Sequence, residues 1–516
     1  MSNRLISVGL LGINVFLAVF LWFLVDGGLI ETGGDAFGRF GEIGDAARGE
    51  GLPRLDHHLL RWGLNIPLFI FLFAIKADHP ALYHLVPALF GAGTSLFVWL
   101  IYQKSEFSIN ANINFALLTL SLMIIPGSER AFSQLLATGP SIFYMVAALF
   151  FLKKAFARHE EHCLVSLFLL AGICCLFAYG SRLAAIWFII PIGGYLFLWS
   201  VKTRHFSAII FFTLPIIIGL IAETVIIYWD TGFIGGRALY VTQATGHAGY
   251  LGNLENHSIV AVDTLSQYLL SPSKYERGLG NFAFPIYFAV IVSFFRLLFR
   301  RSLDGFDRCI SIAVVGLFLL QSYTVVSVFP FIYPEPVTYS RLQFPMLFLS
   351  LVYLGYLISL SRGVYKILEK KYGFIICLLI LCGSFIFLAN PIASKHNNYG
   401  IVVTVLHGKA LREWIDHGGN LGYRGPLELV DKNFDVASSL SKSLNHKVIS
   451  AYVKSVYRRD YCRVSETFVY RQKDTIFGLC SAWKANETVL IYYATSLEFV
   501  RPEGLEFLGM YNDLVN

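Results

Sequence analysis

Residues that could do acid–base chemistry and bind an anion gather in one polar stretch, ETGGDAFGRFGEIGDAARGEGLPRLDHHLLR, from Glu31 to Arg61. Within it, Asp35 follows two glycines and Arg39 lies four residues further on. A carboxylate held in place can take a proton from a nucleophile, and a guanidinium pairs with phosphate oxygens. Asp35 equally fits the N-cap of a helix, with Arg39 one turn later. Both interpretations stay open from these residues alone.

Three further motifs place charged residues beside apolar runs. Glu129 and Arg130 stand together in IIPGSERAFSQ, either as a charge pair at a helix end or as a second acidic wall of the same site. Arg182 lies in YGSRLAA and Arg341 in TYSRLQFP. Tyr339, beside Arg341, either shares a bound phosphate or belongs to the aromatic belt of a membrane interface.

Several kinds of chemistry lack their usual motifs. The chain has no P-loop, no glycine-rich dinucleotide fingerprint, no HExxH and no GxSxG, so ATP-driven transport and serine hydrolysis lose their support. His57 and His58 are adjacent and would face apart on a helix, which argues against a metal site there. The sequence requires no cofactor, although a divalent metal is possible. Glu223, inside an apolar run, is a candidate buried functional carboxylate.

These residues must be held by an apolar framework. The 516 residues are 56% hydrophobic and 15% charged, whereas soluble proteins carry about 25% charged residues. Many apolar runs approach the ~20 residues that cross a bilayer. The net charge of +7 sits in short basic clusters between these runs, as in cytoplasmic loops, and does not indicate nucleic-acid binding. The sequence therefore predicts a multi-pass α-helical membrane protein.

The basic clusters also fix the expected topology. The run Leu64–Ile75 is short and contains Pro67, which is typical of a re-entrant or interfacial helix. If it does not cross, nearly every basic cluster falls on one side. The prediction is then about eleven spans with a cytoplasmic N-terminus. The spans are Leu5–Val25, Leu85–Tyr102, Ile109–Pro126, Ser141–Leu152, Leu164–Tyr179, Ala184–Trp199, Phe206–Tyr228, Phe282–Phe299, Ile310–Phe331, Phe344–Leu360 and Phe374–Ala389.

This topology puts two long loops and the tail on the extracytoplasmic side. We expect a membrane domain over 1–390, with outer loops at 26–84 and 230–280, and a domain over 391–516. The tail has ordinary charge and strand-like runs in VISAYV, ETFVY and TVLIYYA, with a helical stretch at Gly408–Asp416, so it is predicted to be α+β. Its Cys462 and Cys480 form either a disulfide or two unrelated thiols.

The positive-inside rule predicts few arginines in the outer loops. The arginines that this topology nevertheless places there would be explained if they bound an anion. A lipid phosphate headgroup is the natural candidate, because guanidinium forks bind phosphate oxygens in pairs. Most of these arginines are expected to form only surface ion pairs. The set placed outside is Arg39, Arg48, Arg54, Arg61, Arg130, Arg182, Arg237, Arg277 and Arg341.

In this layout the chain resembles the C-type glycosyltransferases, the GT-C superfamily, including protein O-mannosyltransferases and lipid A aminoarabinose transferases. The resemblance lies in GGDAFGRFGEI, DHHLLRWGLNIPLF, SERAFSQLLATGP, YGSRLAA and SRLQFP, in that order. It implies Asp35 as the general base and Glu129 as a substitute for a second acidic residue. It also implies substrate binding by Arg39, His58, Arg130, Arg182, Tyr339 and Arg341, with Arg341 on the donor phosphate.

The chain departs from the family pattern in three ways. Asp35 is followed by Ala36 where many members have a second acidic residue, and the arginine follows at four residues rather than three. The segment Thr138–Ser141 lacks the aspartate that relatives often carry there.

The function implied by this resemblance is the transfer of a sugar, with inversion, from a polyprenyl-phosphate donor to a glycan, lipid or protein acceptor. The reaction would belong to the cell envelope, and the expected location is a bacterial inner membrane. An O-antigen ligase or polymerase is an alternative, with its active loop in Asp230–Gly280. A non-catalytic transporter of lipid-linked glycans is another, and it would need charged residues along its path.

Overall fold

The computed structural model describes most of the chain up to residue 393 and five short segments of the tail. The described stretches are 2–26, 43, 46–47, 49, 60–75, 80–104, 106–125, 127–133, 135–157, 164–232, 234, 236–237, 283–300, 303–321, 323–327, 333–336, 340–393, 448–450, 462–472, 475–482, 490–493 and 506–510. Most of the polar stretch from Glu31 to Arg61 therefore lies outside the described residues.

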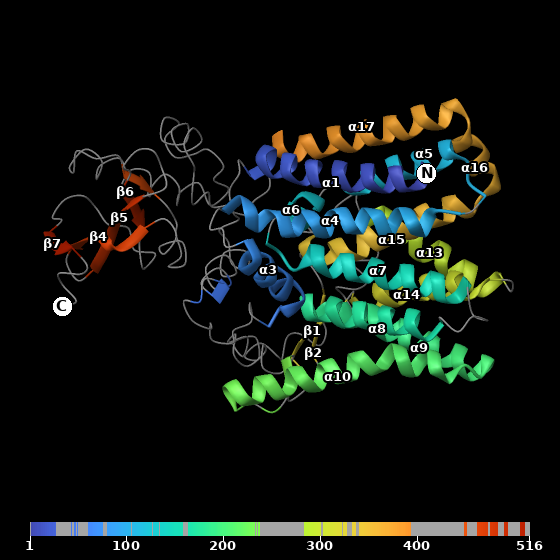
Figure 1. The fold of residues 1–516 in the computed structure, drawn as a ribbon, viewed down its shortest axis with the longest axis horizontal. Helices are drawn as coiled ribbons and strands as arrows, with labels where there is room; N and C mark the ends of the chain where they lie inside the picture. The colour runs from blue at the N-terminus through green and yellow to red at the C-terminus, as the bar shows by residue number, and fades with distance from the viewer. Residues whose placement is uncertain are drawn as a thin grey trace.

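Apolar helices that run lengthwise beside one another form the main body (Figure 1). They are α1 (Ser2–Asp26), α3 (Trp62–Ile75), α4 (Pro80–Tyr102), α5 (Ile109–Leu122), α6 (Ser128–Ser133), α7 (Thr138–Ala157), α8 (Leu164–Ser181), the 3₁₀ turn η1 (Leu183–Ala185), α9 (Ile186–Thr203), α10 (Phe206–Thr231), α13 (Ala283–Phe299), α14 (Gly305–Gln321), α15 (Ser340–Leu360), α16 (Arg362–Glu369) and α17 (Lys371–Ala393).

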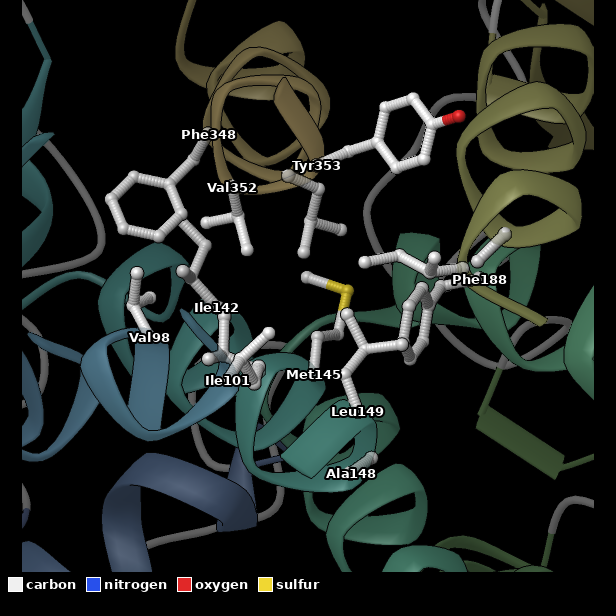
Figure 2. Packing of buried hydrophobic residues seen from close by; sticks show 14 of the residues in the cluster. Val98, Ile101, Ile142, Met145, Ala148, Leu149, Phe188, Phe348, Val352 and Tyr353 are labelled. Carbon is white, nitrogen blue, oxygen red and sulfur yellow. The ribbon is translucent and has the colours of Figure 1, made fainter. Parts of the chain in front are cut away.

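The core is built around α7, which packs between α4, α8 and α15. Figure 2 shows Met145 and Leu149 of α7 facing a space that Val352 of α15 and Phe188 of α9 also fill. Aromatic rings occupy much of this interior, and the large side chains under 2% exposed include Trp99, Tyr102, Tyr353, Phe115, Phe168 and Phe188. The middle of the bundle is therefore filled by packed side chains.

Small residues bring particular helices into close contact. A Cβ at Gly172 of α8 would overlap the carbonyl oxygen of Phe212 in α10, and one at Gly316 of α14 would overlap the ring of Pro191 in α9. Helices in lipid associate mainly by such van der Waals packing, because lipid tails are as apolar as the side chains themselves. These two glycines fix how closely α8 approaches α10 and α14 approaches α9.

The described helices include four that are long and apolar enough to cross a membrane, or five if the bent pair α15–α16 counts as one span. The four are His84–Tyr102, Thr138–Ala157, Leu183–Thr203 and Phe206–Thr231. Six further apolar helices are shorter, with 10–17 residues. An integral membrane protein with several apolar helices is thus supported, and the predicted count of eleven spans is not confirmed.

One predicted span is wrong in its outer part. The run Ile310–Phe331 is not one helix, because α14 ends at Gln321 and Tyr323–Ser327 form the strand β1. This strand pairs antiparallel with β2 (Tyr333–Pro336). Its sequence, YTVVS, is made of β-branched and aromatic residues that favour strands. Hydrophobicity alone does not distinguish such a strand from the last turns of a helix.

Most of the described basic residues cluster at one end of the bundle. Lys153 near the end of α7 donates hydrogen bonds to the carbonyls of Leu100 and Ile101 in the last turn of α4, and to that of Gln103 just after it. Tyr365 of α16 stacks on Phe107 at 4.8 Å, so the ends of α4, α7 and α15 lie together. The same end carries Lys104, Lys154, Lys202, Arg204, Arg296, Arg300, Arg308, Lys366 and Lys370. We call it the basic end.

Helix α3 begins and ends at the opposite end. Trp62 at its start packs against Gly180 and Phe177 near the end of α8. Its last residue, Ile75, is joined through only four residues to Pro80, where α4 begins, and the five steps between them reach at most about 18 Å. This agrees with a segment that does not cross the membrane. We call this end of the bundle the site end.

The described tail segments form a five-stranded sheet in the order β3-β6-β5-β4-β7. The strands are β3 (Val448–Ser450), β4 (Cys462–Gln472), β5 (Thr475–Ala482), β6 (Leu490–Tyr493) and β7 (Glu506–Met510). Strands β3 and β6 are parallel, and the other pairs are antiparallel. Because Gly408–Asp416 lies outside the described residues, an α+β domain stays a prediction.

The sheet register also bears on the two tail cysteines. Cys462 in β4 lies opposite Ala482, and Cys480 in β5 lies opposite Thr467. The register shifts between Cys462 and Thr467, and the two cysteines are not direct cross-strand partners.

We expect Gly172→Ala to destabilise the bundle, because the new methyl group would push α10 away from α8. Overpacking of this kind costs about 1–3 kcal/mol, which thermal unfolding in detergent would show as a lower Tm. Gly194→Ala is the matched control, since nothing lies within 4 Å of a Cβ there and alanine favours a helix over glycine. Equal Tm values for the two variants would contradict close α8–α10 packing.

Candidate functional site

Arg182 lies at the site end, where α8 turns into η1. Its Nη1 donates a hydrogen bond to Oγ1 of Thr138, at 2.9 Å, in the first turn of α7. The side chain is half-buried and lines a small cavity of about 10 Å³. The other residues that line the cavity are Ser141, Met145, Ala184, Ala185, Leu317 and Pro345. A cavity of this size is close to the smallest that holds one water molecule.

Helix α6, which carries Glu129 and Arg130, packs against the beginning of α15. Gly127 precedes α6 with a φ of +99°, a conformation that glycine adopts without strain. A Cβ at this glycine would lie 2.7 Å from the ring of Phe344. Phe132 of α6 also meets Phe348 edge-on at 6.0 Å.

The first turn of α15 brings Arg341 to the same region. Pro345 of this helix lines the cavity together with Arg182. Arg341 precedes Pro345 by four residues within α15, and positions four apart lie on the same face of a helix. The turn that carries Arg182 and the helix that carries Arg341 therefore line one cavity, and the helix that carries Glu129 and Arg130 packs against the beginning of α15.

The structure places the predicted site residues to different degrees. For Arg182 it gives the side chain and its partner. For Glu129, Arg130 and Arg341 it gives the position in a helix but not the side chain. Four predicted residues lie outside the described part of the chain: Asp35, Arg39, His58 and Tyr339.

A second polar cluster surrounds Glu223 at the site end, two turns before the end of α10. Nε1 of Trp62 donates to one carboxylate oxygen at 2.8 Å, and the hydroxyl of Tyr179 donates to the other at 3.4 Å. Glu223 is only 7% exposed. Its role as a candidate buried carboxylate was visible in the sequence. Trp62 and Tyr179 were missed, because 161 and 44 residues separate them from Glu223.

Arg237 completes this cluster from the segment that follows α10. It is 4% exposed, and its Nη1 donates to the carbonyls of Tyr179 and Gly180 at 3.0 and 3.2 Å. Its guanidinium also lies over the Tyr179 ring, 5.4 Å from the centroid, which is a favourable cation–π arrangement. Burial lowers the pKa of Arg237, while the nearby Glu223 carboxylate acts to raise it.

The charged residues at the basic end form their own network. Arg296 of α13 and Asp307 of α14 make an ion pair at 3.1 Å, and the hydroxyl of Tyr356 in α15 donates to Asp307 at 2.7 Å. The backbone N–H of Asp307 in turn donates to the side chain of Asp304, which is the geometry of an N-cap. This network joins three helices and lies far along the bundle from Arg182.

Among the residues that the structure describes, no group of three or more His, Cys, Asp or Glu side chains is arranged to hold a metal ion. His57 and His58 are not among these residues.

No family model matches the chain, and no curated protein matches it. Solved structures similar to it include an oligosaccharyltransferase of Archaeoglobus fulgidus in complex with Zn and sulfate, with a TM-score of 0.46 and 16% identity over 74% of this chain and 53% of that one. The chain spans about half the length of that protein. Another is the archaeal oligosaccharyltransferase AglB from Archaeoglobus fulgidus in complex with an inhibitory peptide and a dolichol-phosphate, with a TM-score of 0.45 and 13% identity over 95% and 76%.

Oligosaccharyltransferases are thus among the structures that this chain resembles, and nothing in these comparisons singles out the O-mannosyltransferases or the aminoarabinose transferases. A TM-score below 0.5 does not establish a common fold. The function must therefore be argued from the residues of this chain.

We expect Trp62→Phe to destabilise the protein by about 1–3 kcal/mol, because the buried Glu223 carboxylate would lose a hydrogen-bond donor. Denaturant or thermal unfolding in detergent would measure the loss. Trp229→Phe is the matched control, since Trp229 is 83% exposed and exposed substitutions usually change stability by less than about 0.5 kcal/mol. If Trp62→Phe behaved like this control, the hydrogen bond would contribute nothing.

Proposed function

We propose that this protein is an inverting glycosyltransferase that moves a sugar from a polyprenyl-phosphate donor to an acceptor at the site end of the helix bundle. The observation that carries the proposal is that the Arg182 turn and the start of α15 line one cavity, and that α6 packs against the same end of α15. Glu129 and Arg130 belong to α6, and Arg341 belongs to the start of α15. We infer that the arginines of these elements bind one anion, the donor phosphate, because guanidinium groups pair with phosphate oxygens.

The chemistry assigned to these residues is a single displacement. Asp35 takes the proton from the acceptor nucleophile, whose lone pair then forms a bond to the anomeric carbon. The bond from that carbon to the phosphate oxygen breaks, and its electron pair leaves with the polyprenyl phosphate. Arg182 and Arg341 stabilise the negative charge that develops there. One displacement inverts the configuration of the sugar.

The other predicted residues serve this reaction by orientation. Arg39, His58, Arg130 and Tyr339 bind parts of the donor or acceptor, and Glu129 supplies a second carboxylate. Holding donor and acceptor together lowers the barrier further, because two molecules then react as one. A divalent metal is compatible with this scheme, and a comparison of transfer with and without EDTA tests for it.

The position of the basic end supports an orientation of the bundle in the membrane, with the basic end on the cytoplasmic side. Basic clusters favour the cytoplasmic face, so the site end, the loop with Asp35 and the tail sheet are assigned to the extracytoplasmic face. The N-terminus of α1 is then cytoplasmic. The cell envelope of a bacterium, with its inner membrane, is the setting we propose, and the acceptor is a glycan, a lipid or a protein.

The two rival functions are less well supported by the described residues. An O-antigen ligase or polymerase would use arginines of the loop 230–280, but Arg237 is buried and donates to the carbonyls of α8. A transporter needs charged groups along a path through the bundle. Glu223 and Arg296 instead belong to separate hydrogen-bonded clusters near opposite ends.

We expect Asp35→Asn to reduce sugar transfer by about 10²–10⁴-fold, because the reaction would lose its general base, while binding of the donor is retained. The measurement is release of polyprenyl phosphate from a labelled polyprenyl-phosphate sugar by purified protein in detergent. Asp45→Asn, which removes a carboxylate from the same loop, is the control. Full transfer by Asp35→Asn, together with loss of transfer in Arg277→Ala, would favour the ligase instead.

We expect Thr138→Val to raise the KM for the donor by about 2–12-fold, with little change in kcat. The guanidinium of Arg182 would lose one hydrogen-bond acceptor, and a net hydrogen bond contributes about 0.5–1.5 kcal/mol. Thr94→Val is the control, because that hydroxyl bonds only to the carbonyl of Phe90 in its own helix. A KM that changes in neither variant, or equally in both, would argue that Arg182 does not contact the donor.

A further inference from the structure

The position of Glu223 needs an explanation, because a carboxylate buried in an apolar helix is costly. Charged groups within membrane helices are rare, and they usually mark a functional site. The hydrogen-bond partners of Glu223, Trp62 and Tyr179, are not among the residues that line the Arg182 cavity. Its role must therefore come through the residues it does contact, Trp62 and Tyr179.

These contacts join three separate parts of the chain. Trp62 follows the polar stretch that carries Asp35 and begins α3. Tyr179 lies three residues before Arg182, at the end of α8. Arg237 comes after α10, at the beginning of the long second polar loop. Glu223 lies where these three segments meet.

The cluster holds the turn that presents Arg182. Arg237 donates to the carbonyls of Tyr179 and Gly180, which would otherwise lack partners at a helix end. The indole of Trp62 lies against Gly180, where a Cβ would come within 2.5 Å of the ring. Within the turn, the amide of Arg182 donates to Ala178 at 2.9 Å, and the amide of Ala185 donates to Arg182 at 3.0 Å.

We propose that Glu223 is a positioning residue that locks the Arg182 turn and ties it to Trp62, at the beginning of α3, and to Arg237, after the end of α10. It does so by holding the indole of Trp62 on one side of Gly180 and by balancing the charge of Arg237 on the other. This inference rests on the proposed function in one respect, that Arg182 binds the donor phosphate. The coupling itself is a property of the fold.

Loss of the carboxylate would act on two hydrogen bonds at once, because the indole N–H of Trp62 and the hydroxyl of Tyr179 would lose their acceptor. The buried guanidinium of Arg237 would also lose the nearby negative charge that favours its protonated form. A buried polar group left without a partner is costly. The Arg182 turn would then open more often, while the distant ion pair of Arg296 and Asp307 would be untouched.

The test compares Glu223→Leu and Glu223→Gln with the wild-type protein by amide hydrogen exchange in nanodiscs. We expect exchange at Arg182 and Ala185 to become at least about tenfold faster in Glu223→Leu, and amides near Asp307 to be unchanged. Glu223→Gln keeps one carbonyl oxygen for the indole, so its effect should be intermediate. It also keeps the test valid if Glu223→Leu does not fold. Thr213→Val is the control, because Thr213 bonds only to its own helix.

A second measurement separates positioning from general stability. The KM for the donor should rise in both variants in proportion to the faster exchange at Arg182, with kcat changed less than KM. Faster exchange throughout the bundle would indicate a merely structural role and overturn the proposal. Unchanged exchange at Arg182 and Ala185 would also overturn it.

The exchange and KM measurements fail separately, so a wrong role for Glu223 can be told apart from a wrong proposed function. If wild-type protein transferred no sugar, the exchange measurement would still decide whether Glu223 holds the turn. If exchange at the turn rose while the donor KM stayed the same, the turn would not serve donor binding, and the positioning role would be overturned.

Discussion

The burial of charge in an apolar bundle is the constraint on which this structure depends. The Glu223 carboxylate is stable there because two side chains donate hydrogen bonds to it and a buried guanidinium lies nearby. Arg296 and Asp307 meet the same requirement at the basic end with an ion pair and a tyrosine hydroxyl. Between these clusters the core residues are large and apolar. These two clusters of buried charge therefore lie near opposite ends of the described bundle.

This arrangement explains why residues far apart in the sequence come together. Each helix that begins or ends at the site end places its terminal polar residues at that end of the bundle. Arg182 follows α8, Glu129 and Arg130 lie in the short helix before α7, and Arg341 opens α15. The apolar helices between these residues are of similar length, so the chain returns to the site end after each pair of helices. A charged site thus forms without any single local motif that would identify it.

The sequence was most informative where it combined charge with hydrophobic pattern. The apolar runs and the grouping of most described basic residues at one end follow from that combination, while the non-crossing character of Leu64–Ile75 stays a prediction. The partners of Glu223 did not follow from it, because nothing local to Trp62 or Tyr179 indicates a contact with a residue far along the chain. The strand at Tyr323–Ser327 was mistaken for helix, since an apolar run of β-branched residues fits both structures until its length is known. Asp35 stays a prediction, because its loop lies outside the described residues.

The early end of α14 has a consequence for the lipid around it. Its 17 residues rise about 26 Å, whereas the hydrocarbon layer is about 30 Å thick. If α14 spans the bilayer, thinning of the bilayer beside it is one response to a helix shorter than the hydrocarbon layer. Headgroups on that side would then lie closer to Leu317 and Pro345, which line the Arg182 cavity. For the donor phosphate proposed to bind Arg182, such thinning would shorten the distance out of its leaflet.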